Sequence, residues 1–186
     1  MSGEHKKAPG FVNGLSGAFV IGFAFDLAKD QLLLIEKKRP LWMAGLLNGV
    51  GGKIEPNESP EQAMAREFFE EANVSTLSSD WKLFHYEKRF DGPELYFFCA
   101  DIPGLMDHTK SMTDERLLAY TNIEQQMATD EGIHGKLMYN LKFLIPMAKC
   151  YLQHPEHRYS PMKRHLMTIC EPESHVGENV CIGTRE

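Results

Sequence analysis

The chain has 186 residues, of which 42% are hydrophobic and 25% charged, and its formal net charge is −6. These values are ordinary for one globular domain that folds without disulfide bonds or structural metal. The acidic balance argues against duplex nucleic acid as a partner, because phosphate contacts usually need a basic surface. The sequence contains neither a C-x-x-C pair, nor an N-terminal signal core, nor an apolar run long enough to cross a membrane. We therefore expect a cytoplasmic protein whose four cysteines are reduced (Cys99, Cys150, Cys170 and Cys181).

The first third of the chain predicts a hairpin and then a glycine-rich segment. Residues 1–14 are polar and contain glycine and proline, so we expect a loose leader there. Two runs rich in apolar residues, at 15–26 and 31–38, are separated by a short turn, which predicts a β-hairpin. The segment 46–55 (LLNGVGGKIE) follows as an extended, glycine-rich stretch.

A helix with clear boundaries is predicted at 60–72. Ser59 is a suitable N-cap, and Pro60 takes the first helical position. Gln62 stands where it completes a capping box with Ser59. Asn73 stands where the helix should end, and asparagine tolerates the left-handed conformation that helix ends often require.

The second half predicts another hairpin, a last strand and C-terminal helices. The runs at 81–90 and 94–102 flank an Asp-Gly-Pro turn, and 116–122 reads as a further strand. A short helix is predicted to begin at Ile123, and a longer one covers 135–153, bent at Pro146.

These elements predict an α/β fold in which helices pack on a mixed sheet. We assign the folded domain to residues 15–153. The tail at 154–186 has little periodicity, and we expect part of it to be disordered.

Three carboxylates lie on one face of the predicted helix. Glu67, Glu70 and Glu71 stand at i, i+3 and i+4, so neighbouring Cβ atoms are roughly 5–6 Å apart. Carboxylates this close repel one another unless a positive charge lies between them, and such oxygen ligands suit Mg²⁺. Arg66 can reach Glu70 one turn on, or fold back to Glu58. An acidic triplet alone is more often a solvated helix face.

The spacing of the whole segment favours a metal site over a solvated face. The pattern begins with a glycine, five residues, a glutamate and seven residues. It continues with Arg-Glu, an apolar residue, any residue, Glu-Glu, two positions and an apolar residue. The matching residues are Gly52, Glu58, Arg66, Glu67, Phe68, Glu70, Glu71 and Val74. This pattern resembles the Nudix box of the Nudix (MutT-type) hydrolases. One position departs, since the family's glycine after the Glu-Glu pair is Asn73 here.

The resemblance implies a Nudix-fold α/β/α sandwich and a metal-dependent hydrolase that cleaves a diphosphate linkage in a nucleotide. It assigns the metal ligands, for Mg²⁺ or Mn²⁺, to Glu67, Glu70, Glu71, Glu115 and the Gly52 carbonyl, with Gly51 as the alternative carbonyl. The general base is one of these glutamates. Arg66 and Glu58 would orient the ligands, and Asn73 would close the helix. Many relatives form dimers, which leaves a homodimer open here.

The substrate is less constrained. The NGVGGK segment is similar to that of relatives that cleave purine nucleoside triphosphates, in which Asn48 would contact the base, with Gly51 and Lys53 near the phosphates. This favours a (deoxy)nucleoside triphosphate, with pool sanitising of oxidised purines as one form. The aspartate pair that reads an oxidised purine is missing at 135–139, although Asp130 is near. ADP-ribose or a nucleotide sugar is the alternative. A non-catalytic nucleotide sensor and an mRNA-cap hydrolase are disfavoured, by the intact acidic residues and by the net charge.

Other residues admit two readings each. The basic run at 36–39 either meets a polyphosphate or is solvated, and Trp42 either stacks on a base or closes the core. His85, His108 and His134 are scattered and are expected to be structural or surface residues.

Overall fold

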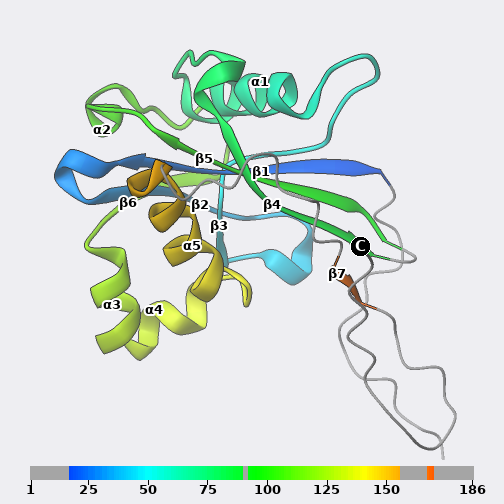
Figure 1. Ribbon diagram of the computed structural model, residues 1–186. Coiled ribbons are helices and arrows are strands. Elements are labelled where there is room, and N and C mark those ends of the chain that lie inside the picture. The colour runs from blue at the N-terminus through cyan, green and yellow to red at the C-terminus, as the bar shows by residue number, and fades with distance from the viewer. Residues whose placement is uncertain (1–16, 90–91, 156–166, 170–186) are drawn as a thin grey trace, which may run out of the picture.

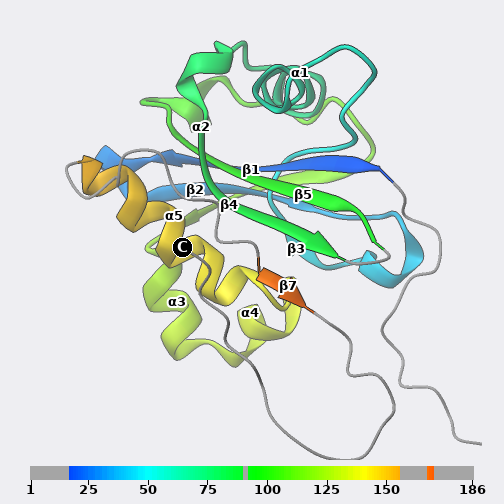
Figure 2. The same cartoon turned by 45° about the vertical axis from the view of Figure 1, so that its right-hand side comes forward.

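A computed structural model describes residues 17–89, 92–155 and 167–169. Within these residues, a mixed sheet lies between two layers of helices (Figure 1). On one side lie α1 (Pro60–Ala72) and α2 (Leu105–His108); on the other lie α3 (Ile123–Thr129), α4 (Glu131–Lys136) and α5 (Leu141–Gln153) (Figure 2). The α/β/α sandwich expected from the sequence is confirmed.

The described part of the sheet contains seven strands. They are β1 (Ala18–Asp26), β2 (Gln31–Glu36), β3 (Leu47–Asn48), β4 (Lys82–Arg89), β5 (Glu94–Asp101), β6 (Arg116–Thr121) and β7 (Met167–Ile169). The order is β3-β2-β1-β5-β4-β7, and β6 pairs with β2 along its whole length. The predicted hairpins β1–β2 and β4–β5 are antiparallel, whereas β1 runs parallel to β5, so the sheet is mixed.

The side chains of β2 alternate between two hydrophobic cores, one on each face of the sheet. Leu32 and Leu34 belong to the core that α3, α4 and α5 cover. Leu33 and Ile35 belong to the core that contains the apolar side of α1. Because both faces are covered, the strand is a continuous apolar run rather than an alternating one.

The predicted helix at 135–153 is wrong in its first third. The structure has two helices there, α4 and α5, separated by residues 137–140. Leu137 pairs with Leu47 of β3, and the Met138 N–H donates to the Leu47 carbonyl at 3.0 Å. These hydrogen bonds to the sheet replace those of a continuing helix. Pro146 lies inside α5.

Most of the two predicted terminal segments lies outside the described residues. This applies to the leader at 1–14 and to most of the tail, in which the strand β7 runs parallel to β4. Cys99 is buried and Cys150 exposed, both as free thiols, whereas Cys170 and Cys181 lie outside. None of the helices in the described ranges combines the length and the apolar character that a membrane crossing requires.

Candidate active site

The helix α1 begins and ends as its sequence predicts. Ser59 Oγ accepts a hydrogen bond from the Gln62 N–H at 3.2 Å, and Gln62 Oε1 accepts one from the Ser59 N–H at 2.8 Å. Asn73 adopts the left-handed conformation, with φ 57°, and its N–H donates to the Phe69 carbonyl. The two caps fix where the helix begins and ends, and its buried residues pack against the sheet.

The glycine-rich segment runs antiparallel to β1 and passes directly beside α1. The Val20 N–H donates to the Gly52 carbonyl at 2.9 Å. A Cβ at Gly51 would overlap the Val20 carbonyl oxygen, and a Cβ at Gly52 would lie 2.5 Å from the Glu67 carboxylate. Glycine is therefore required at Gly51, where φ is 155° and the backbone of β1 is in contact, whereas a side chain at Gly52 would displace the Glu67 carboxylate.

Arg66 joins the helix to the preceding loop. Its guanidinium lies 2.6 Å from Glu58, 2.9 Å from Glu67 and 3.1 Å from Glu70, and it also donates to the Lys53 carbonyl at 3.0 Å. The sequence left open whether Arg66 contacts Glu70 or Glu58, and in the structure it contacts both. The hydrogen bond from Arg66 holds the pKa of Glu58 below its usual range, and the same bond raises the pKa of Arg66.

The carboxylates of α1 differ in their surroundings. Glu70 is 54% exposed, whereas Glu67 and Glu71 are largely covered. Burial raises the pKa of Glu67, although Arg66 opposes the shift, and burial raises the pKa of Glu71 to about 7. Glu71 Oε2 also accepts a hydrogen bond from the Gly51 N–H at 3.1 Å. Burying two neighbouring carboxylates is unfavourable unless cations accompany them.

Glu115 reaches this cluster because the loop before β6 docks on the end of α1. The last carbonyls of a helix have no partner within the helix. Here the Met112 N–H donates to the Glu71 carbonyl at 3.1 Å, and the Lys110 N–H donates to the Ala72 carbonyl at 3.0 Å. Glu115 follows three residues later and is buried. The loop thus places a fourth glutamate beside the helix, close enough to Glu71 for the two charges to interact.

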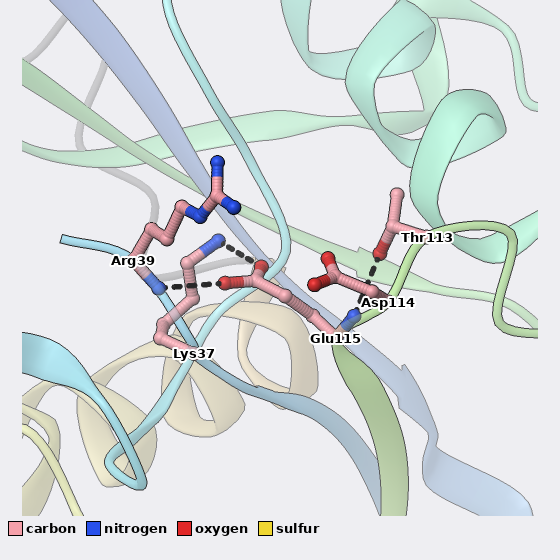
Figure 3. A pocket seen from close by; sticks show the side chains of 5 residues that line it. All are labelled: Lys37, Arg39, Thr113, Asp114 and Glu115. Atoms are coloured by element: carbon pink, nitrogen blue, oxygen red, sulfur yellow. Dashed lines mark hydrogen bonds and ion pairs between the residues drawn. The ribbon is translucent and has the colours of Figure 1, made fainter. Parts of the chain in front are cut away.

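Lys37 lies between Glu71 and Glu115. Its ammonium nitrogen is 2.6 Å from Glu115 Oε2 and 3.7 Å from Glu71 Oε1 (Figure 3 shows the bond to Glu115). Glu115 Oε1 accepts a further hydrogen bond from the Lys38 N–H at 2.7 Å. Burial opposes ionisation of Glu115, yet these bonds keep its pKa below the usual range.

Lys37 was missed as a site residue, since the sequence placed it in a basic run that either meets a polyphosphate or is solvated. The signal that could have found it is the period of the strand. Leu33 and Ile35 face α1, and Lys37 continues the same alternation one step beyond the end of β2. Its side chain therefore points toward the carboxylates of α1.

A pocket of about 420 Å³ opens beside this lysine. Its lining comes from the end of β2 and the loop before β6: Lys37, Arg39, Thr113, Asp114 and Glu115 (Figure 3). The Glu115 carboxylate points toward Lys37 and the Arg39 backbone, while the Arg39 guanidinium points away from that carboxylate. The pocket thus offers both a carboxylate and a cation to a bound molecule.

The other predicted residues lie apart from this cluster or have structural partners. Asn48 is half-buried, and its Oδ1 accepts a hydrogen bond from the Gly49 N–H at 2.9 Å. Lys53 is exposed beside Gly17. Trp42 is 45% exposed, which disfavours the one of its two readings in which it closes the core; stacking on a base stays a prediction.

The histidines and Asp130 have local roles. His85 lies 3.2 Å from Glu87, and His134 contacts the Met127 carbonyl. His108 is exposed at the end of α2. Asp130 caps α4 by accepting a hydrogen bond from the Gly132 N–H, which gives its carboxylate a structural partner.

The positions between the carboxylates are taken by side-chain cations. In the described ranges, no three His, Cys, Asp or Glu side chains surround a point suited to a metal ion. Arg66 draws Glu58, Glu67 and Glu70 to itself, and Lys37 does the same to Glu71 and Glu115. A divalent cation would therefore have to replace or shift these ion pairs.

A sequence model of the NUDIX domain matches residues 18–131, which is more than half of the chain. The chain belongs to the Nudix family. As a Nudix protein it is a hydrolase of diphosphate linkages in nucleotide-type compounds, and the family generally uses divalent metal ions. The matched range contains α1, the glycine-rich segment and Glu115.

Two solved MutT-type structures are similar to this Nudix chain. One is a MutT structure from work on Aliivibrio salmonicida and Vibrio cholerae, with 21% identity and TM-score 0.49, covering 64% of this chain and 95% of the other. The second is a MutT/nudix family protein from Enterococcus faecalis, with 20% identity and TM-score 0.45, covering 62% of this chain and 46% of the other. No curated protein matches the chain in sequence.

Proposed function

We propose that this Nudix hydrolase is Mg²⁺-dependent and cleaves a diphosphate linkage of a (deoxy)nucleoside triphosphate. One observation carries the proposal. Glu71 of α1 and the distant Glu115 meet at Lys37, beside the Gly51 N–H of the glycine-rich segment and next to a pocket that Glu115 and Arg39 line.

The donor set fits a hard divalent cation. Five carboxylates lie here in two groups, and among the described residues their ion-pairing cations are Arg66, beside Glu58, Glu67 and Glu70, and Lys37, beside Glu71 and Glu115. Oxygen ligands in such excess suit Mg²⁺, with Mn²⁺ as the alternative. Glu67, Glu70, Glu71 and Glu115 would hold the cation, together with the Gly52 or Gly51 carbonyl. A bound cation would neutralise charge on the phosphates and make water a stronger acid.

Side chains of the protein would position the ligands, accept the proton and bind the phosphate. Arg66 ties the carboxylates of Glu58, Glu67 and Glu70 together in the metal-free protein, and its ion pairs with Glu67 and Glu70 would shift when these two become ligands. The proton of the attacking water passes to Glu115 or to one of the α1 glutamates. Arg39 is exposed and lines the pocket, where it would bind a phosphate.

The choice of nucleotide is supported by the segment NGVGGK. Asn48 would contact the base, and Lys53 and Gly51 would lie near the phosphates. An oxidised purine triphosphate is one substrate to test, and ADP-ribose and a nucleotide sugar are the alternatives.

The proposal is tested by a product assay with Mg²⁺. The panel contains 8-oxo-dGTP, the ordinary dNTPs, ADP-ribose, a nucleotide sugar, a diadenosine polyphosphate and NADH. We expect cleavage of a nucleoside triphosphate, and we expect Glu67→Gln and Glu70→Gln to lower kcat by roughly a hundredfold or more. Glu61→Gln, in the first turn of the same helix, is the matched control and should keep full activity.

Two results would contradict the proposal. Cleavage of ADP-ribose or a nucleotide sugar alone would move the substrate to the alternative class. Binding of nucleotides without any turnover would indicate a nucleotide sensor, and Asn73, the one departure from the family pattern, would then be the first residue to restore to glycine.

A further inference from the structure

We infer that Lys37 is a positioning residue, an internal counter-cation that holds Glu71 and Glu115 together and exchanges with the divalent cation. The inference rests on the proposed function, because it concerns the metal affinity of the same site. It adds that a side chain of the protein competes with the divalent cation for two of the carboxylates.

The burial of Lys37 indicates a specific role for its charge. Its side chain is only 14% exposed, although an ammonium group is strongly hydrated in water. Its partners are Glu115 at 2.6 Å and Glu71 at 3.7 Å. Removing the ammonium from water is unfavourable, and the two carboxylates offset that loss. Glu115 makes the closer contact, and each of the two covered carboxylates also accepts a backbone hydrogen bond, from the Lys38 N–H or the Gly51 N–H.

The backbone around Lys37 aims its side chain at these carboxylates. The Lys37 N–H donates to the Leu46 carbonyl at 2.9 Å, and the Lys37 carbonyl accepts from the Gly45 N–H at 2.8 Å. This pair of bonds closes the loop that follows β2. The backbone at the end of β2 is therefore held in place, and it positions the Lys37 ammonium beside the two carboxylates.

Lys38 provides the contrast. Its side chain is 52% exposed, and it pairs at 3.6 Å with Asp114, which is more exposed still. A solvent-exposed ion pair of this kind contributes little to the stability of the protein. The two neighbouring lysines therefore share a charge and a loop but differ in burial, which makes Lys38 a matched control.

Lys37 and a divalent cation compete for the same two carboxylates. Two cations that share Glu71 and Glu115 would repel each other at a few ångströms, where burial weakens screening. Binding of the divalent cation therefore releases the ammonium. The adjoining pocket, lined by Arg39 and Thr113, gives the released side chain space beside the site (Figure 3).

The first experiment measures Mn²⁺ binding to the full chain, with free Mn²⁺ followed by electron paramagnetic resonance. Lys37→Met keeps the aliphatic length of the side chain and removes its charge. We expect this variant to bind Mn²⁺ roughly tenfold more tightly than wild type, which corresponds to about 1.4 kcal/mol. Its melting temperature in EDTA should fall. Lys38→Met should change the dissociation constant by less than about twofold.

The second experiment uses the wild-type protein and does not depend on the folding of a variant. Lysines are acylated with an N-hydroxysuccinimide ester at one fixed pH, and each site is quantified by peptide mass spectrometry. We expect the acylation rate of Lys37 to be several-fold higher in saturating Mg²⁺ than in EDTA, while that of Lys38 stays constant.

The outcomes separate the inference from the proposed function. An unchanged or weaker Mn²⁺ affinity in Lys37→Met, or an acylation rate of Lys37 that ignores Mg²⁺, overturns the role of Lys37 and leaves the hydrolase intact. Absence of Mn²⁺ binding in wild type and variants alike overturns the proposed metal site, and the exchange with it.

Discussion

Glu71 is the residue at which helix, glycine-rich segment and Lys37 meet. Its carboxylate accepts the Gly51 N–H and faces the Lys37 ammonium, yet burial dominates and raises its pKa to about 7. The folded, metal-free protein therefore binds a proton at Glu71 over a pH range in which the unfolded chain does not. Folding stability must then depend on pH.

The sign of this dependence follows from the raised pKa. Stability from Glu71 is complete below its unfolded pKa, near 4.5, and is lost as the pH rises to about 7. The loss amounts to about 3 kcal/mol, since each pKa unit corresponds to about 1.4 kcal/mol. In EDTA, urea unfolding of Glu71→Gln should lack this decline, so the variant should match the stability of wild type near pH 4.5 and exceed it above about pH 7. Parallel pH profiles for the two proteins would contradict the prediction.

At the scale of elements, two features stabilise the C-terminal end of α1: the Asn73 cap and the loop before β6. Asn73 closes the helix in the left-handed conformation, and the loop before β6 binds the carbonyls just before it. A residue with a Cβ and no local hydrogen-bonding side chain is strained at this φ by about 1–2 kcal/mol. We expect Asn73→Ala to lose about 1 kcal/mol of unfolding free energy.

Asn73→Gly is the control, because glycine adopts this conformation without strain. Its unfolding free energy should equal that of wild type or slightly exceed it. The measurement is urea denaturation in EDTA, so that metal affinity does not enter the comparison. An alanine variant as stable as the glycine variant would show that the end of the helix is held by the loop alone.

The sequence predicts α1 well because its capping signals are local. In the region 131–153 the same kind of reasoning misses the break between two helices. Ile133, Leu137, Leu141 and Ile145 are all buried and stand four residues apart. This helical spacing continues across the break between α4 and α5, so periodicity does not mark it. The break comes from pairing with β3, which is a tertiary contact that no local pattern contains.

The same distinction applies to the site. The glutamates of α1 are predictable from their spacing, because one helix turn brings them together. Glu115 is predictable only through family resemblance, since it is brought to α1 by the docking of a loop. Lys37 is hidden in a basic run, and its role depends on which carboxylates the fold places opposite it.

For the whole molecule, the site is a local excess of negative charge on a chain that is already acidic. The formal net charge is −6, and the five carboxylates beside α1 contribute to this excess of negative charge. A divalent cation that binds only the folded protein stabilises it by mass action, by about 2.7 kcal/mol at one hundred times the dissociation constant.

We therefore expect Mg²⁺ to raise the melting temperature at pH 8 by roughly 5–10 °C relative to EDTA. The shift should be smaller at pH 6, where a proton competes at Glu71. The double variant Glu67→Gln, Glu70→Gln should lose most of the shift, whereas Glu61→Gln should keep it. Identical melting curves of the wild type in EDTA and Mg²⁺ would place the proposed metal site in doubt.

The pairing of β6 with β2 also determines when the site can exist during synthesis. The ribosome releases α1 with all its carboxylates before it makes Glu115, which joins them only when the strand that follows has added to β2. A nascent chain that ends near residue 110 thus carries the complete sequence signature without the complete cluster. Until β6 is in place, Lys37 has a single carboxylate of this pair to meet, Glu71, so the site is completed only after the second half of the domain has been made.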